Sequence, residues 1–158
     1  MKHCRVLFVC TGNICRSPLA EAVFREQARA AGALDRFEID SAGTHGWHQG
    51  EQADPRAQAV GRRHGAEVTS RARRVQADDF ARFDIMLAMD RGHLRELRER
   101  CPPDARARLH LMREFDEHPG NGAEMDVPDP YYDGIQAFEQ VYAILEPSCR
   151  RLLAELRK

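Results

Sequence analysis

Apolar residues along the chain form two kinds of pattern, short continuous runs and longer segments with helical spacing. The runs at 6–9 and 83–89 are uninterrupted and rich in branched and aromatic side chains. Runs of this kind are typical of strands that are buried on both faces, as in a parallel sheet. Two further strands are predicted at 37–41 and 109–112.

The segment after the first strand has the features of a helix. Ser17 is a suitable N-cap and Pro18 a suitable first helical residue, and Gly32 provides a stop. The apolar face of this predicted helix is formed by Leu19, Ala22, Val23 and Ala30.

Three more helices follow by the same reasoning. Asp54 caps one that ends near His64, and Asp90 caps another over 91–100. The last helix is predicted to start near Asp133, and Pro147 should kink or interrupt it. Strands that alternate with helices predict a single α/β domain over residues 1–158, with a doubly wound parallel sheet and its site at the carboxyl ends of the strands.

Composition excludes several classes of protein. The 24 basic and 25 acidic residues give a net charge of −1, which argues against nucleic-acid binding. No apolar run approaches the length of a membrane helix, and the N-terminus lacks a signal-peptide pattern. The five cysteines are odd in number and irregularly spaced, without the close pair of a zinc site. We therefore expect a cytoplasmic protein with reduced thiols, without membrane insertion or bound metal. Composition does not determine the oligomeric state, for which a monomer is the default.

The chemistry concentrates in the loop at 10–17, between the first strand and the first helix. Cys10 and Arg16 form a C-x5-R pair, and Gly12 and Asn13 tolerate the positive φ that a tight loop requires. Such a loop directs backbone N–H groups and the positive end of a helix dipole at one point, where an anion binds. The other members of this predicted phosphate-binding loop are Thr11, Gly12, Asn13, Ile14, Cys15 and Ser17.

The same loop suggests a reaction. Arg16 can contact two oxygens of a phosphate with its guanidinium fork, and the positive field favours a thiolate at Cys10. The Ser17 hydroxyl can donate a hydrogen bond to the sulfur. A thiolate facing a bound phosphate is a nucleophile for phosphoryl transfer through a phosphocysteine intermediate.

Such a nucleophile needs an acid to protonate the leaving oxygen. The segment 125–134 offers Asp126 and Asp129, and Asp129 stands between two prolines on a rigid stretch of chain. The residues alone do not choose between the two carboxyl groups.

Several motifs together resemble the low molecular weight protein tyrosine phosphatases. Residues 9–18 are similar to the N-terminal phosphate-binding loop of that family, and the other matches occur in family order over nearly the whole chain. These matches are Asp40-Ser41-Ala42-Gly43-Thr44, Trp47-His48, Ala53-Asp54-Pro55-Arg56-Ala57, Phe83-Asp84, Met89-Asp90 and Asp129-Pro130-Tyr131. The resemblance implies an open four-stranded parallel sheet flanked by helices on both faces, and no cofactor.

The resemblance also implies roles for individual residues. Cys10 is then the nucleophile, Arg16 the phosphate clamp and Asp129 the general acid. Trp47 and Tyr131 form the walls of a phosphotyrosine slot. Ile14 lines the floor of this slot. The resemblance further implies that the substrates of the enzyme are proteins that contain phosphotyrosine.

Further implied roles concern support and regulation. Asn13, Ser41 and His64 belong to a hydrogen-bond network that holds the loop. From the residues alone, His64 is equally suited to interact with the carboxyl end of a helix. Tyr131 or Tyr132 could be phosphorylated by a tyrosine kinase, as in some relatives.

Three other functions compete with this interpretation. An arsenate reductase of the same fold needs two further cysteines after the third strand, where the chain has Ala88 and Cys101. A protein-arginine phosphatase of the same superfamily carries Thr where this chain has Ile14. A phosphate-binding module without catalysis would not need Cys10, Arg16 and Asp129 together.

The family also suggests that Cys15 protects Cys10 from oxidation. Cys15 lies five residues further along a curled loop, which makes a disulfide feasible. We expect peroxide to convert the pair to a disulfide that thiols reduce, whereas the Cys10 of a Cys15→Ser variant proceeds to irreversible acids. The measurement is phosphatase activity after peroxide and then dithiothreitol. Equal recovery in the variant and the wild type would contradict the prediction.

Overall fold

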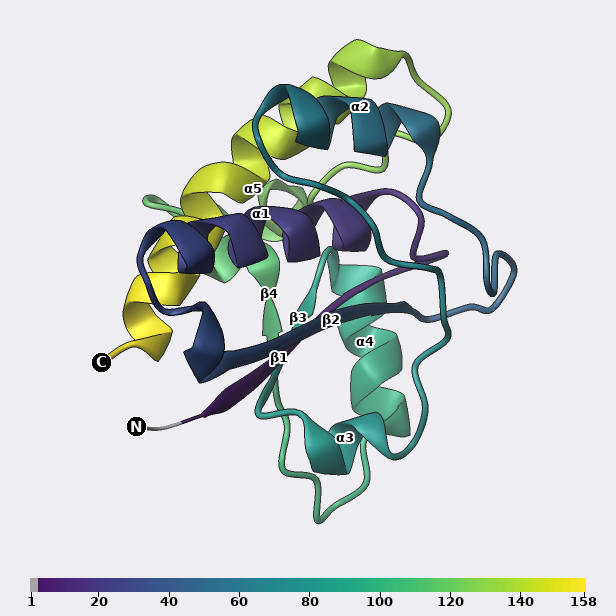
Figure 1. Cartoon of the computed structure of the whole chain (residues 1–158). Helices are drawn as coiled ribbons and strands as arrows, with labels where there is room; N and C mark the ends of the chain where they lie inside the picture. The colour runs from purple at the N-terminus through teal and green to yellow at the C-terminus, as the bar shows by residue number, and fades with distance from the viewer. Residues whose placement is uncertain (1–2) are drawn as a thin grey trace.

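The structure, a computed structural model, describes residues 3–158 and is built around a parallel sheet (Figure 1). The predicted domain also includes Met1 and Lys2, which lie outside the described residues. The sheet has four strands in the order β2-β1-β3-β4, and all three neighbouring pairs are parallel. The strands are β1 (Cys4–Cys10), β2 (Phe37–Gly43), β3 (Ile85–Ala88) and β4 (Arg108–Leu111).

Helices cover both faces of the sheet, as predicted. The face with α1, α2 and α5 and the face with α3 and α4 are separated by the sheet in Figure 1. The α-helices are α1 (Arg16–Ala30), α2 (Pro55–Arg63), α3 (Asp79–Arg82), α4 (Arg91–Arg100) and α5 (Ile135–Leu156). Short 3₁₀ helices lie at η1 (Leu34–Arg36), η2 (Met112–Phe115) and η3 (Gly122–Met125).

The central strand β1 divides the core in two. Val6 and Phe8 pack with the helices on one face, whereas Leu7 and Val9 pack with the cluster on the other. All four side chains are fully buried, which explains why the sequence shows a continuous apolar run in place of alternation. β1 pairs with both β2 and β3, so its carboxyl end lies at the middle of the sheet edge.

Two of the predicted helix caps are confirmed and one is wrong. Asp54 Oδ1 accepts a hydrogen bond from the Arg56 backbone, and Asp90 Oδ1 accepts one from the His93 backbone. Ser17, however, is not the cap of α1. The helix begins at Arg16, two residues before the predicted start at Pro18, and Cys15 is in the cap position. The hydroxyl of Ser17 makes its hydrogen bonds with Cys10 and Asn13 instead.

The last helix also differs from the prediction. α5 begins at Ile135, two residues after Asp133, and runs to Leu156 with Pro147 inside it, so the predicted interruption is wrong. A proline removes the N–H that would bond to the carbonyl four residues earlier. That carbonyl belongs to Ala143, which is exposed, so water can satisfy it.

Gly43 ends β2 where the chain approaches the Cys10 loop, with Cys10 as its register partner on β1. A Cβ at Gly43 would lie 2.5 Å from the Thr11 carbonyl oxygen and 2.9 Å from that of His45. Both are backbone atoms, so the loop itself would have to move.

We expect Gly43→Ala to lower the free energy of unfolding by about 1–3 kcal/mol, because the added methyl group overpacks a rigid contact. The measurement is urea denaturation. Gly46→Ala is the control, since its nearest contacts would be ordinary ones at 3.7 Å to the Arg74 side chain. Equal midpoints for the two variants would contradict the prediction.

Candidate active site

The loop between β1 and α1 places Cys10 at the amino end of the helix. Its side chain is buried, and its Sγ lies 2.9 Å from Ser17 Oγ. Ser17 Oγ also accepts a hydrogen bond of 2.8 Å from Asn13 Nδ2. Because Ser17 Oγ already accepts this hydrogen bond, its own hydrogen is available for donation to the sulfur.

Asn13 shapes this loop through both its backbone and its side chain. It has a φ of +60° and is the one non-glycine residue with positive φ in the described part of the chain. Its side-chain nitrogen, Nδ2, donates to Ser17 Oγ and, at 3.0 Å, to Ser41 Oγ. Its side-chain oxygen, Oδ1, accepts a hydrogen bond of 3.0 Å from the Arg73 backbone. Asn13 and Ser41 thus both contact the loop network, as expected from the resemblance.

Gly12, in contrast, does not need a positive φ. A Cβ on this residue would lie 2.8 Å from Cδ2 of His48, so glycine provides space for a neighbouring side chain. His48 is in turn held by Glu51, whose Oε2 lies 2.9 Å from Nδ1.

The network ends at a buried carboxyl group, that of Glu21, which sequence analysis missed. Ser41 Oγ donates to Glu21 Oε1 at 2.6 Å, and Arg25 lies 3.0 Å from the other oxygen. Burial raises the pKa of Glu21, although the hydrogen bonds from Ser41 and Arg25 oppose this. Its position four residues after Ser17, on the same side of the helix, was the available signal.

Arg16 is almost completely buried beside the loop, with 4% of its side chain exposed. Its Nη1 donates to Asp90 Oδ2 at 3.1 Å and to the Val127 carbonyl at 2.9 Å. Its Nη2 lies 3.9 Å from Asp129 Oδ2. The guanidinium group is thus fixed from one side and faces Asp129 with the other.

The structure separates the two candidate acids. Asp129 lines the same cavity as Cys10 and has about half of its side chain exposed. Asp126 instead bonds to Arg91, with Oδ1 2.9 Å from the backbone nitrogen and Oδ2 3.1 Å from Nη2. Although burial works in the opposite direction, these hydrogen bonds lower the pKa of Asp126, which keeps it a carboxylate.

These groups meet in a cavity of about 240 Å³ with aromatic side chains at its rim. Trp47 is 69% exposed and stacks on His45 with ring centroids 4.3 Å apart. The rings of Tyr131 and Tyr132 meet edge to face at 5.0 Å. The lining residues are Cys10, Thr11, Gly12, Ile14, Cys15, Arg16, Trp47, His48, Asp129, Tyr131 and Tyr132.

Comparison with known proteins identifies the family. A family model described as low molecular weight phosphotyrosine protein phosphatase matches residues 5–158. The chain belongs to this family. A low molecular weight protein-tyrosine-phosphatase of Streptomyces coelicolor is 48% identical over 155 residues, which cover 98% of this chain and 94% of that protein.

Solved structures of this phosphatase fold agree. A protein tyrosine phosphatase from Entamoeba histolytica, with Hepes in its active site, has a TM-score of 0.91 and 40% identity, covering 98% of this chain and 97% of its own. A Drosophila arginine phosphatase has a TM-score of 0.89 and 31% identity, covering 100% of this chain and 99% of its own.

Within the phosphatase fold, Cys15 lines the cavity but differs from Cys10 in its surroundings. Burial raises the pKa of the Cys15 thiol well above its ordinary value, and the nearby Asp54 and Cys10 raise it further. Cys15 is therefore a neutral thiol at physiological pH.

One residue that sequence analysis missed is His93, in the first turn of α4. It is 5% exposed, with Nε2 2.6 Å from Thr11 Oγ1 and Nδ1 3.2 Å from Asp90 Oδ1. Burial, and then the charge of Arg16, lower the pKa of His93 to about 4 in spite of the neighbouring Asp90. Its place three residues after a cap at the sheet edge was the available signal.

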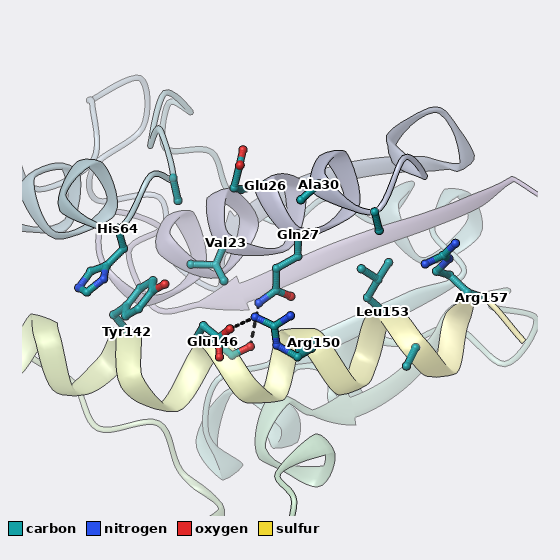
Figure 2. Close-up of a pocket in the computed structure, with 13 residues that line it drawn as sticks. Val23, Glu26, Gln27, Ala30, His64, Tyr142, Glu146, Arg150, Leu153 and Arg157 are labelled. Atoms are coloured by element: carbon teal, nitrogen blue, oxygen red, sulfur yellow. Dashed lines mark hydrogen bonds and ion pairs between the residues drawn. The ribbon is translucent and has the colours of Figure 1, made fainter.

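The prediction that His64 supports the loop is wrong. His64 follows α2, where its Nε2 lies 2.8 Å from Glu139 Oε2 and its ring stacks on Tyr142 at 3.9 Å. Figure 2 shows the two rings side by side at a groove of about 520 Å³ between α1 and α5. Because these partners belong to α5, His64 joins helices and does not contact the phosphate loop.

Two further observations concern metals and membranes. Among residues 3–158, no group of three or more His, Cys, Asp or Glu side chains is arranged to hold a metal ion. No helix in that range combines the length and apolar character that crossing a bilayer requires.

The pKa of His93 predicts a pH dependence of stability. Since it falls from about 6.5 in the unfolded chain to about 4 in the fold, the folded state favours the neutral ring. The resulting stabilisation is present above pH 6.5 and is lost as the pH falls toward 4, a difference of about 3 kcal/mol.

We therefore expect the wild type to lose about 3 kcal/mol more than His93→Gln between pH 7 and pH 4, because glutamine does not titrate. The measurement is urea unfolding at a series of pH values. Parallel profiles for the two proteins would contradict the prediction.

Proposed function

We propose that residues 1–158 form one phosphatase domain that hydrolyses phosphotyrosine in proteins through a phosphocysteine intermediate. The observation that carries this proposal is the convergence of Cys10, Arg16 and Asp129 on one cavity at the amino end of α1. Family membership supports the same chemistry.

The reaction proceeds in two steps. The Cys10 sulfur attacks phosphorus and forms an S–P bond, the P–O bond to the tyrosine breaks, and Asp129 gives its proton to the leaving oxygen. Water then attacks the phosphocysteine, Asp129 takes a proton from it, and the S–P bond breaks to release inorganic phosphate and the thiolate.

The loop and Arg16 stabilise the charge that this transfer develops. Backbone N–H groups at a helix start and a fixed guanidinium group bind the equatorial oxygens without reorganising. Because Asp90 and the Val127 carbonyl already hold Arg16, the substrate does not have to order it.

The shape of the cavity supports an aromatic substrate. Trp47 and Tyr131 supply flat walls and Ile14 an apolar floor, which suits a phenyl ring above a bound phosphate. The arginine phosphatase among the structural neighbours makes phosphoarginine the second candidate substrate. Ile14, where such enzymes carry Thr, favours phosphotyrosine.

Arsenate reduction receives less support from the structure. Cys101 follows the carboxyl end of α4, whereas Asp90, which contacts Arg16, precedes its amino end. A helix of 10 residues separates them, about 15 Å of rise, so Cys101 is poorly placed to relay electrons to Cys10.

The proposal includes a setting for the enzyme. It acts in the cytoplasm as a monomer on phosphotyrosine proteins, with no cofactor, metal or nucleic acid. A tyrosine kinase that modifies Tyr132 or Tyr131 would meet accessible side chains, which are 89% and 39% exposed.

The experiment compares kcat/KM on a phosphotyrosine peptide and a phosphoarginine peptide of the same sequence. We expect a preference of ~100-fold for phosphotyrosine, the scale on which an apolar pocket discriminates. Cys10→Ser should reduce both activities to background. Preference for phosphoarginine would overturn the substrate assignment, and turnover by Cys10→Ser would overturn the nucleophile.

A further inference from the structure

The segment that carries the proposed general acid has little secondary structure of its own. Asp129 and residues 131–134 are exposed, and α5 begins only at Ile135. Before the segment, the Val127 backbone is fixed on both sides, with its nitrogen 2.8 Å from the Met89 carbonyl. A second anchor is needed on the other side if Asp129 is to keep its place at the cavity.

Arg56, in the first turn of α2, supplies that anchor. Its Nη1 donates to the Asp133 carbonyl at 2.6 Å, and its Nη2 donates to the Tyr131 carbonyl at 2.9 Å. One planar guanidinium group thus spans two carbonyls that are two residues apart, which defines the turn between them.

Hydrogen bonds inside the turn connect this anchor to the acid. The Asp133 nitrogen donates to the Pro130 carbonyl at 3.0 Å, which closes the turn. The Tyr131 nitrogen donates to Asp129 Oδ1 at 3.1 Å, so the carboxyl group is oriented by the residue whose carbonyl Arg56 holds. The other oxygen, Oδ2, is left facing Arg16.

Arg56 is itself fixed by the side of the molecule that carries the phosphate loop. Its Nε and Nη2 lie 3.0 and 2.9 Å from the two carboxylate oxygens of Asp54, and its guanidinium carbon lies 4.5 Å from the centre of the Phe138 ring. The Asp54 backbone donates to the Ile14 carbonyl at 2.8 Å. Figure 1 shows α2 beside the start of α5, the arrangement that makes these contacts possible.

We propose that Arg56 is the positioning residue of the general acid, and that it fixes the distance between Asp129 and the phosphate loop. The proposal rests on the proposed function. Arg56 is not among the residues that line the cavity, so it acts on the acid through the turn. Because a displacement of about 1 Å can cost ~100-fold in rate, a tether of this kind controls how well a proton reaches the leaving oxygen.

The test uses the dependence of the rate on the leaving group. The phenolate that leaves phenyl phosphate is strongly basic and needs a proton from the general acid. The p-nitrophenolate that leaves p-nitrophenyl phosphate is weakly basic and departs without one. The measured quantity is kcat/KM, which reports the steps from free enzyme and substrate to the transition state.

We expect Arg56→Met to lower kcat/KM for phenyl phosphate by ~100-fold and for p-nitrophenyl phosphate by less than about threefold. Arg56→Lys keeps the charge but cannot span both carbonyls, so it should show the same selective loss at smaller size. In an Asp129→Asn background, Arg56→Met should add little, because the acid it positions is already gone.

Arg63→Met is the matched control, since Arg63 lies on the same helix but has a different partner. Its Nη1 donates to Glu139 Oε1 at 2.6 Å, and Glu139 is not part of the turn. It should leave both rates near those of the wild type, and thermal melts should establish that all variants are folded. Equal losses on the two substrates, no loss, or full additivity with Asp129→Asn would overturn the proposal. Failure of the proposed function would instead show as no turnover by the unmodified protein.

Discussion

The left-handed backbone of Asn13 is the constraint on which the phosphate site depends. A φ of +60° is unfavourable for most residues, but asparagine adopts it more readily. The same side chain then contacts α1 through Ser17, β2 through Ser41 and the segment before α3 through Arg73. Glycine could adopt the backbone without these contacts. The loop is thus held in the shape of an anion site before any substrate arrives.

Buried charges extend this arrangement outward from the loop. Arg16 would be costly to bury alone, but Asp90 and the Val127 carbonyl satisfy one side of it. Arg73 similarly bonds Asp79 while its backbone holds Asn13. Because removing one partner would deprive the buried Arg16 or Asp79 of its opposite charge, these pairs resist rearrangement.

Much of this was accessible from the sequence where the signal was local. The Cys10 loop, the caps at Asp54 and Asp90 and the buried central strand all follow from neighbouring residues. The prediction that Ser17 caps the helix was wrong because the same hydroxyl can either cap a helix or bond to the Cys10 sulfur. Only the fold shows which of these partners it bonds.

Distant partners were out of reach of the sequence. His93 meets Thr11 across 82 positions and Arg56 meets Tyr131 across 75, and no local pattern encodes either contact. His64 shows the opposite error, because a family match carries over the residue type but not its neighbours. Its partner Glu139 lies 75 positions away, on α5.

The spread of the loop's partners along the chain has a consequence for biosynthesis. The residues that hold the loop lie 28, 60, 82 and 111 positions from those they contact. Contacts of such long sequence separation form late, after the loop-closure entropy has been overcome. On a ribosome, Cys10 emerges first, and Arg16 is fixed only when Val127 has followed. A nascent chain therefore carries the cysteine long before it carries an enzyme, and its reactivity starts with the completed fold.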